Sequence, residues 1–200
     1  MMNQPPSHSD EQELIQAAKQ GHLESFNQLV MRYQRQVYNV VLRMLSVPAA
    51  AEDITQEAFI SAYRNLHTFH AGNFSAWLLR IASNASLDYL RSAQVRRNTS
   101  LELLLDGQTF APQDGEETPE DYTIRRELGF EIQKGLSLLS TEQRLAIVLV
   151  DIQGYPYEEA ADIIRIPVGT LKSRLSRARL AMRDYLVMQT ELLPREFRSS

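Results

Sequence analysis

A basic segment near the C-terminus carries the most distinctive chemistry in the sequence. Six Lys and Arg residues and no acidic residue occur from Arg165 to Arg183. An α-helix fits the major groove of DNA, where Arg can bond to guanine and where Lys or Ser can reach bases and phosphates. The apolar residues of this segment recur at helical spacing and predict a buried stripe made of Leu171, Leu175, Ala178 and Met182. The candidate DNA contacts on the other faces are Thr170, Lys172, Ser173, Arg174 and Arg177.

The residues before this segment favour DNA binding over an ordinary solvated basic surface. The pattern predicts a short helix from about Tyr157 to Ile164, a tight turn at 165–167, and a last helix from Val168 to about Met188. Two helices joined by a brief turn, with the second helix basic, describe a helix-turn-helix. A solvated surface helix lacks this docking geometry.

An acidic patch is predicted in the N-terminal half. Asp53 and Glu57 are one helical turn apart, and with Gln56 they present carboxylate and amide groups on one face of a helix. Such a patch suits an Arg-rich protein surface. A solvated helix face is the alternative interpretation.

A third group of polar residues surrounds the helix that follows Gly72. Trp77 is in line with Ile81 and Ala85, so we expect it to anchor the core. Arg80, Asn84 and Arg91 project from other faces and could contact a nucleic-acid strand. The preceding loop, 67–73, is polar and aromatic and includes His70 and Asn73.

The sequence contains no recognisable group of catalytic residues. The chain contains no cysteine, and its four histidines lack acidic partners at metal-ligand spacing, so we expect neither a metal site nor a cofactor. There is no glycine-rich phosphate loop and no nucleophile with a plausible base. We therefore expect a protein that is not an enzyme.

Periodicity predicts an all-α protein of two small helical domains. The apolar spacing favours helices from residue 10 to 97 and again from 123 to 190, and capping boxes begin at Ser9 and Ser140. Residues 98–122 combine turn formers with acidic side chains, which is typical of a flexible linker. No stretch resembles a secretory signal or a membrane span, which favours a cytoplasmic protein.

Three blocks of sequence closely resemble the sigma-70 family of bacterial RNA polymerase sigma factors, in its extracytoplasmic-function group. The residues 154–161 and 166–178 resemble region four, which in that family reads the minus-35 promoter element. Residues 51–59 look like the family's core-polymerase-binding helix, and 74–84 with Asp88 and Arg91 look like its minus-ten recognition helix.

The resemblance assigns a role to each candidate residue. It implies that Asp53, Gln56 and Glu57 bind core RNA polymerase. Promoter DNA would be contacted at the minus-ten element by His70, Asn73, Arg80, Asn84 and Arg91, and at the minus-35 element by Thr170, Lys172, Ser173, Arg174 and Arg177. The loop at 67–73 would capture a flipped base during melting. The resemblance also implies an anti-sigma factor as a partner.

Three positions depart from the family pattern. Arg165 occupies a turn position where the family usually has Gly, so the turn could be wider or the side chain could contact a phosphate. Ser140 replaces a common Pro, and His22 stands where an acidic cap is usual.

Two other classes of protein remain compatible with parts of the pattern. A helix-turn-helix repressor or activator would bind its operator alone, usually as a dimer. A helical adaptor would bind only protein and leave the basic helix solvated. The acidic patch distinguishes a sigma factor from a simple repressor. A sigma factor requires Asp53 and Glu57 for activity, whereas a simple repressor should tolerate their loss.

Overall fold

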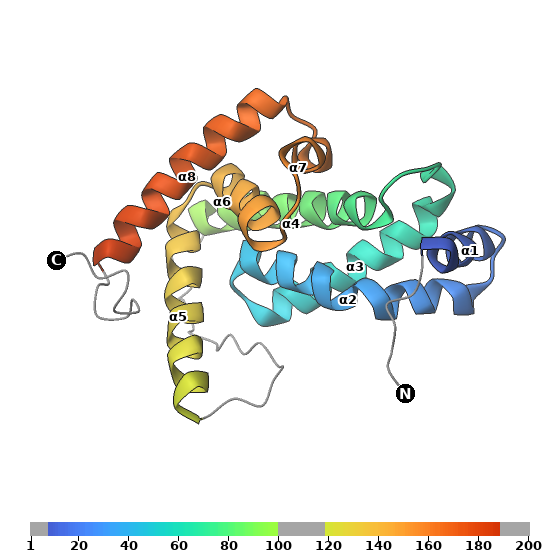
Figure 1. Ribbon diagram of the computed structural model, residues 1–200, viewed down its shortest axis with the longest axis horizontal. Coiled ribbons are helices and arrows are strands. Elements are labelled where there is room, and N and C mark those ends of the chain that lie inside the picture. The colour runs from blue at the N-terminus through green and yellow to red at the C-terminus, as the bar shows by residue number, and fades with distance from the viewer. Residues whose placement is uncertain (1–7, 100–118, 189–200) are drawn as a thin grey trace.

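The computed structural model describes residues 8–99 and 119–188 of the chain, and within these ranges it is helical, as expected, with no strand (Figure 1). The N-terminal half contains α1 (His8–Lys19), α2 (Leu23–Leu45), α3 (Pro48–Asn65), the short 3-10 helix η1 (Leu66–Thr68) and α4 (Phe74–Thr99). The C-terminal half contains α5 (Pro119–Leu138), α6 (Thr141–Ile147), the π-helical turn η2 (Val148–Ile152), α7 (Tyr157–Ile164) and α8 (Val168–Met188).

The N-terminal half is a bundle in which α2, α3 and α4 pack against one another and α1 packs against α2. Its centre is closed by side chains with little or no exposed surface, namely Leu29, Val37, Val40, Ala58, Leu78 and Leu79. Leu29, Val37 and Val40 lie on one face of α2, so the helical apolar spacing seen in the sequence corresponds there to a buried face. The bundle supports the loop between η1 and α4.

The C-terminal half builds the predicted helix-turn-helix from α7 and α8 on a base of α5 and α6. The capping box predicted at Ser140 is confirmed, because its side chain accepts a hydrogen bond from the backbone of Gln143 and the Gln143 side chain accepts one in return. Leu171 and Leu175 of α8 are buried, as is Ala178, while Met182 is partly buried. The apolar stripe of α8 therefore faces its own domain.

The turn between α7 and α8 is tight. Arg165 adopts the left-handed conformation, with φ 55° and ψ 52°, and its N–H bonds back to the end of α7. This conformation favours glycine, which explains the glycine expected at this position. A wider turn, one of the two possibilities raised by the sequence, is not what the chain adopts.

Two helix starts differ from the sequence prediction. α5 begins at Pro119, within the segment 98–122 that was predicted to be a linker, and Pro is favoured at the first position of a helix because its missing N–H would be unpaired there anyway. α1 begins at His8, one residue before the predicted cap at Ser9. Most of the predicted linker, residues 100–118, lies outside the described residues. Across the described part of the chain, no helix combines the length and the apolar character needed to span a membrane.

The two halves pack directly against each other. α7 lies against α4, and α5 and η2 lie against α2. Gln133 donates from Nε2 to the carbonyl of Arg43 at 3.1 Å, and Arg144 donates from Nη1 to the carbonyl of Met44 at 2.5 Å. The last carbonyls of a helix lack partners within it, and a cation is favoured at that end. Side chains of the C-terminal half thus cap the end of α2.

Candidate functional site

A groove between α2 and α3 contains most of the predicted acidic patch. Its volume is about 670 Å³. α3 contributes Glu52, Asp53, Thr55, Gln56 and Phe59 to its walls, and α2 contributes Val30, Gln34, Arg35 and Tyr38. The structure therefore joins Asp53 and Gln56 in one concave surface, whereas Glu57 is exposed on α3 without lining the groove.

The groove presents charge and hydrogen-bonding capacity next to an apolar floor. Phe59 is buried, and the Oγ1 of Thr55 is buried without a hydrogen-bond partner among the described residues. Burial and the neighbouring Glu52 carboxylate both raise the pKa of Tyr38, so its hydroxyl is a neutral donor at physiological pH. A partner side chain with donor groups could bond to the carboxylates of Glu52 and Asp53.

Sequence reasoning missed the α2 wall of this groove. Gln34 and Tyr38 are one helical turn apart, a spacing that places them on one face. The polar side chains that interrupt the apolar pattern of α2 could have indicated that this face of the helix is exposed. Their position opposite α3 depends on helix packing and could not be read from the sequence.

The predicted minus-ten loop is anchored by an aromatic residue rather than displaying one. Phe69 is 7% exposed, and its ring centroid lies 5.4 Å from that of Phe74 and 5.5 Å from that of Trp77. Lys19 of α1 donates to the Phe69 carbonyl and places its ammonium 5.7 Å from the ring centroid. Trp77 is partly buried in this cluster, in agreement with its predicted role as a core anchor.

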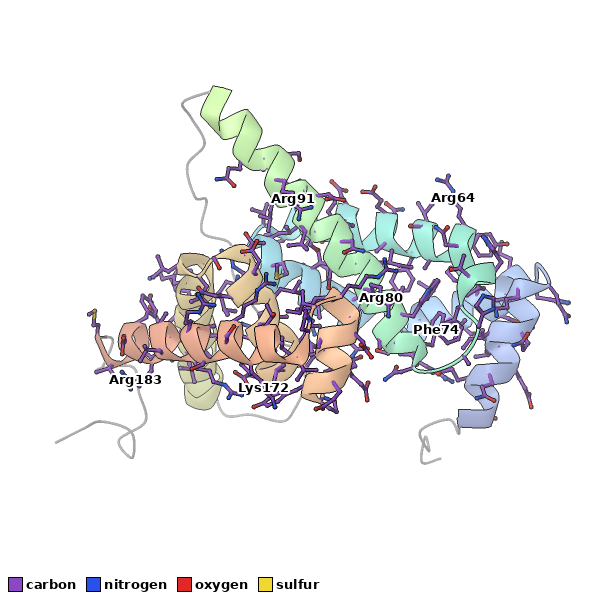
Figure 2. All side chains as sticks on the ribbon, turned by 90° about the horizontal axis from the view of Figure 1, so that it is seen from above. Arg64, Phe74, Arg80, Arg91, Lys172 and Arg183 are labelled. Carbon is purple, nitrogen blue, oxygen red and sulfur yellow. The ribbon has the colours of Figure 1, made fainter. Side chains whose placement is uncertain are left out.

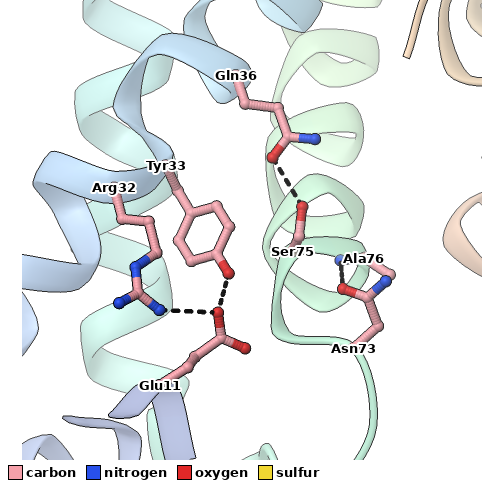
Figure 3. Close-up of polar contacts among 7 residues, drawn as sticks. All are labelled: Glu11, Arg32, Tyr33, Gln36, Asn73, Ser75 and Ala76. Carbon is pink, nitrogen blue, oxygen red and sulfur yellow. Dashed lines mark hydrogen bonds and ion pairs between the residues drawn. The ribbon is translucent and has the colours of Figure 1, made fainter. Parts of the chain in front are cut away.

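Contacts at α1 brace the same region (Figure 3). Tyr33 donates its hydroxyl to Glu11, and Arg32 forms an ion pair with Glu11 at 3.3 Å. Burial, followed by the bond to Glu11, raises the pKa of Tyr33 far above its ordinary value, so the phenol remains a donor. The ring centroid of Tyr33 also lies 5.6 Å from that of Phe74, which follows the loop, so these contacts join α1 and α2 to the start of α4.

His70 and Asn73 are the two loop residues that were predicted to contact the minus-ten element. His70 is exposed. Asn73 uses its side-chain oxygen to accept from the N–H of Ala76 at 3.1 Å, which caps the start of α4 (Figure 3). Its amide nitrogen donates to Glu159 at 3.0 Å. Both ends of the Asn73 side chain are therefore occupied.

The three candidate contacts on α4 occupy different environments along the helix. Arg80 is partly buried, and its Nε is buried without a partner in the described part of the chain. Asn84 is exposed, as is Arg91, which forms an ion pair with Asp88 at 2.9 Å. Figure 2 shows Arg80 and Arg91 spaced along α4. They do not form one compact cluster.

α8 presents its basic side chains outward (Figure 2). Lys172, Ser173 and Arg177 are exposed, while Thr170 and Arg174 are partly buried. The ammonium of Lys172 lies 5.7 Å from the centroid of the Tyr157 ring, and Arg177 donates from Nε to the carbonyl of Ser173 at 3.2 Å. The five predicted minus-35 residues therefore lie on the first three turns of one helix.

Arg179 has a structural role that the sequence did not reveal. Its guanidinium makes two hydrogen bonds to the Asp151 carboxylate, at 2.6 Å and 3.0 Å, and reaches the Tyr157 hydroxyl at 3.5 Å. These bonds raise its pKa above its ordinary value. Arg179 thus ties α8 to η2 and α7 and holds the helix-turn-helix in shape.

Family models match both halves of the chain. The Sigma-70 region 2 model matches residues 29–96, and the Sigma-70, region 4 model matches residues 129–182. The first match covers the groove and α4, and the second covers the helix-turn-helix. The chain is similar in sequence to known sigma factors over most of its length.

The sigma factor SigW of Bacillus subtilis is 37% identical over 177 residues, which cover 86% of this chain and 94% of SigW. The sigma-E factor of Escherichia coli strain K12 is 37% identical over 86% of this chain and 92% of its own. SigE of Mycolicibacterium smegmatis is 35% identical over 84% of this chain, which spans 63% of that longer protein.

Solved structures agree with the arrangement of the helices. The sigma factor RpoE of Bartonella quintana, in complex with the anti-sigma factor NepR, matches with a TM-score of 0.67 at 26% identity, over 82% of this chain and 97% of RpoE. CnrH, in complex with the cytosolic domain of CnrY, shares the fold with a TM-score of 0.64 at 23% identity, over 88% of this chain. The chain belongs to the sigma-70 family of RNA polymerase sigma factors, in the extracytoplasmic-function group. Sigma factors are transcription initiation factors without catalytic activity of their own.

Proposed function

We propose that this chain binds core RNA polymerase and directs it to promoters, with α8 reading the minus-35 element and α4 with its preceding loop reading the minus-ten element. The observation that carries the proposal is the combination, on one chain of this family, of an acidic groove in region 2 and an outward-facing basic helix in region 4. A repressor needs only the second feature.

The groove between α2 and α3 is the proposed polymerase interface. Asp53 and Gln56 line it, and Glu57 extends the acidic surface one turn further along α3. Carboxylates at the rim of a partly apolar groove suit a partner helix with basic side chains, because charge complementarity favours encounter and fixes register. Tyr38 and Gln34 add hydrogen-bonding groups on the opposite wall.

DNA recognition is divided between the two halves. Arg174 and Lys172 are suited to the edges of bases and to phosphates in the major groove, and Thr170 and Ser173 lie on the same turns of α8. His70, Asn73, Arg80, Asn84 and Arg91 would contact the minus-ten element, and the exposed part of the loop would hold a base released from the duplex. Unstacking a base costs a few kcal/mol, which these contacts would offset.

The proposed partners are core polymerase, promoter DNA and an anti-sigma factor. The structural relative RpoE is bound to an anti-sigma factor, and we extend this type of partner to the present chain. The proposed domain boundaries remain 10–97, 98–122 and 123–190, with the middle segment as a linker. The proposed site of action is the cytoplasm.

The experiment that tests the polymerase interface is a binding measurement with purified bacterial core polymerase. The double variant Asp53→Lys/Glu57→Lys should lose binding by at least about 100-fold, because truncating or reversing interfacial charges costs several kcal/mol. The matched control, Glu13→Lys/Glu158→Lys, makes the same change of charge at exposed acidic residues outside the groove and should bind like the unaltered chain. Equal binding by both variants would refute the assignment of the groove.

A further inference from the structure

Arg165, in the turn between α7 and α8, has a backbone conformation in which glycine would be free of strain. Across residues 8–99 and 119–188, the non-glycine residues with a positive φ are Ser46, at 63°, and Arg165, at 55°. Residues with such strain cluster at sites where a contact or a function compensates for it. Ser46 has a compensating contact, because its Oγ accepts a hydrogen bond from Gln133 Nε2 at 2.7 Å. Within the same ranges, the chain offers the Arg165 side chain no contact of this kind.

The guanidinium of Arg165 is exposed and free to bind a partner. In the described part of the chain it forms no hydrogen bond, ion pair or ring contact. Several basic side chains of α8 are already held by neighbours. Lys172 lies over the Tyr157 ring, Arg177 bonds to the Ser173 carbonyl, Arg179 pairs with Asp151, and Arg183 pairs with Asp184. Arg165 is therefore more available to a partner than these four cations are.

The place of Arg165 in the helix-turn-helix gives it access to a DNA backbone. It is the C-cap residue of α7, and α8 begins at Val168. When a helix-turn-helix docks, the second helix enters the major groove by its N-terminal end, while the first helix crosses the backbone. The turn between the two helices then lies at the edge of the groove, where the phosphates run.

The charge of α7 creates a need for a cation at this place. α7 carries Glu158, Glu159 and Asp162 and no basic residue. Three carboxylates on a helix that crosses a phosphate backbone oppose binding, because like charges repel. Arg165 follows directly at the end of α7 nearest to α8. Its guanidinium is not paired with the Asp162 carboxylate, so its charge remains available to a phosphate.

We propose that Arg165 binds a backbone phosphate beside the minus-35 element, and that this contact accounts for a strained arginine in the turn. This inference rests on the proposed function, because it requires α8 to lie in the major groove. A guanidinium suits a phosphate, since its planar N–H groups can donate to two oxygens at once. Such a contact positions the helix and carries no sequence information. Arg165 thus contributes affinity, whereas Arg174 is the residue proposed to read a base.

The salt dependence of promoter binding tests this role. The chain in complex with core polymerase would be titrated into a labelled duplex of a promoter that it transcribes in vitro, from about 50 to 200 mM salt. The variants Arg165→Gly and Arg165→Ala remove the cation, and Arg165→Lys keeps it. Fluorescence anisotropy gives the slope of log affinity against log salt for each protein.

Both variants that lack the cation should reduce the steepness of this slope by about 0.9, the value for one phosphate contact. Their loss of affinity should therefore be about 3.5-fold greater at 50 mM than at 200 mM salt. The loss should be equal on an unrelated duplex, because every sequence offers phosphates. Arg165→Lys should keep the slope of the unaltered chain, since an ammonium also displaces a counterion.

Glycine separates this role from a structural one. Arg165→Gly relieves the backbone strain and should stabilise the fold, so weaker DNA binding by this variant would not arise from misfolding. Arg165→Ala keeps the strain and loses the same charge. The two variants should therefore differ in stability and agree in salt slope. A fall in affinity for alanine alone would indicate an effect of turn shape and would overturn the proposal.

Arg183→Ala is the matched control for loss of charge. Arg183 is exposed on the same helix, and its guanidinium is already paired with Asp184 at 2.7 Å. Its removal should change the slope by less than half as much. An equal change for Arg183→Ala, or an unchanged slope for both Arg165→Gly and Arg165→Ala, would overturn the phosphate contact and leave the proposed function intact. Failure of the unaltered complex to bind any promoter would instead overturn the proposed function, and this inference with it.

Discussion

The backbone conformation of Arg165 sets the tight turn between the two helices of the helix-turn-helix. It takes a left-handed conformation, with φ 55°, at the end of α7. An L-residue in this conformation is disfavoured by about 1–2 kcal/mol, and glycine avoids this cost. Hydrogen bonds offset this cost, because the N–H groups of Arg165 and Ile166 donate to carbonyls at the end of α7.

Replacing Arg165 by glycine should stabilise the protein. The relief of strain exceeds the extra flexibility that glycine gives the unfolded chain, leaving a gain of about 0.5–1 kcal/mol in the free energy of unfolding. Urea denaturation monitored by circular dichroism measures it. Arg165→Ala is the control, since alanine removes the side chain and keeps the backbone strain, and it should give no gain. A gain of equal size from alanine would contradict this explanation.

At the scale of the elements, the sequence predicted the helices and their exposed faces well. The helix-turn-helix bounds and the capping box at Ser140 follow from local rules, in which apolar spacing and cap residues decide where a helix begins and ends. The early start of α5 was missed because Pro119 lies in a segment whose acidic and turn-forming composition favoured a linker.

The basic helix α8 carries the next prediction. Arg174→Ala should weaken binding to a cognate promoter by about 1–3 kcal/mol and leave binding to unrelated DNA little changed, if Arg174 reads a base. Arg183→Ala removes the same charge at the exposed far end of α8 and should weaken both by a similar small amount. Fluorescence anisotropy of polymerase complexes measures both. Equal losses on the two DNAs for Arg174→Ala would show a phosphate contact instead.

At the scale of the whole molecule, the relation between the halves could not be predicted. Sequence patterns describe contacts within a helix or between neighbours, whereas Arg144 and Met44 meet across 100 positions. Likewise, the sequence described the loop 67–73 only as polar and aromatic, and its Phe69 is buried because Phe74 and Trp77 approach it from the next helix. The sequence identified the candidate residues. It did not show which of them are exposed and which are already held by contacts within the chain.

In vitro transcription tests whether this chain directs core polymerase to promoters. Core polymerase would be incubated with a pool of promoter fragments, with and without this chain. We expect new transcripts that begin downstream of a shared pair of upstream motifs, and we expect their loss with Asp53→Lys/Glu57→Lys. If the folded chain yields no transcript and binds DNA tightly as a dimer without polymerase, it acts as a conventional repressor or activator and the proposed function is wrong.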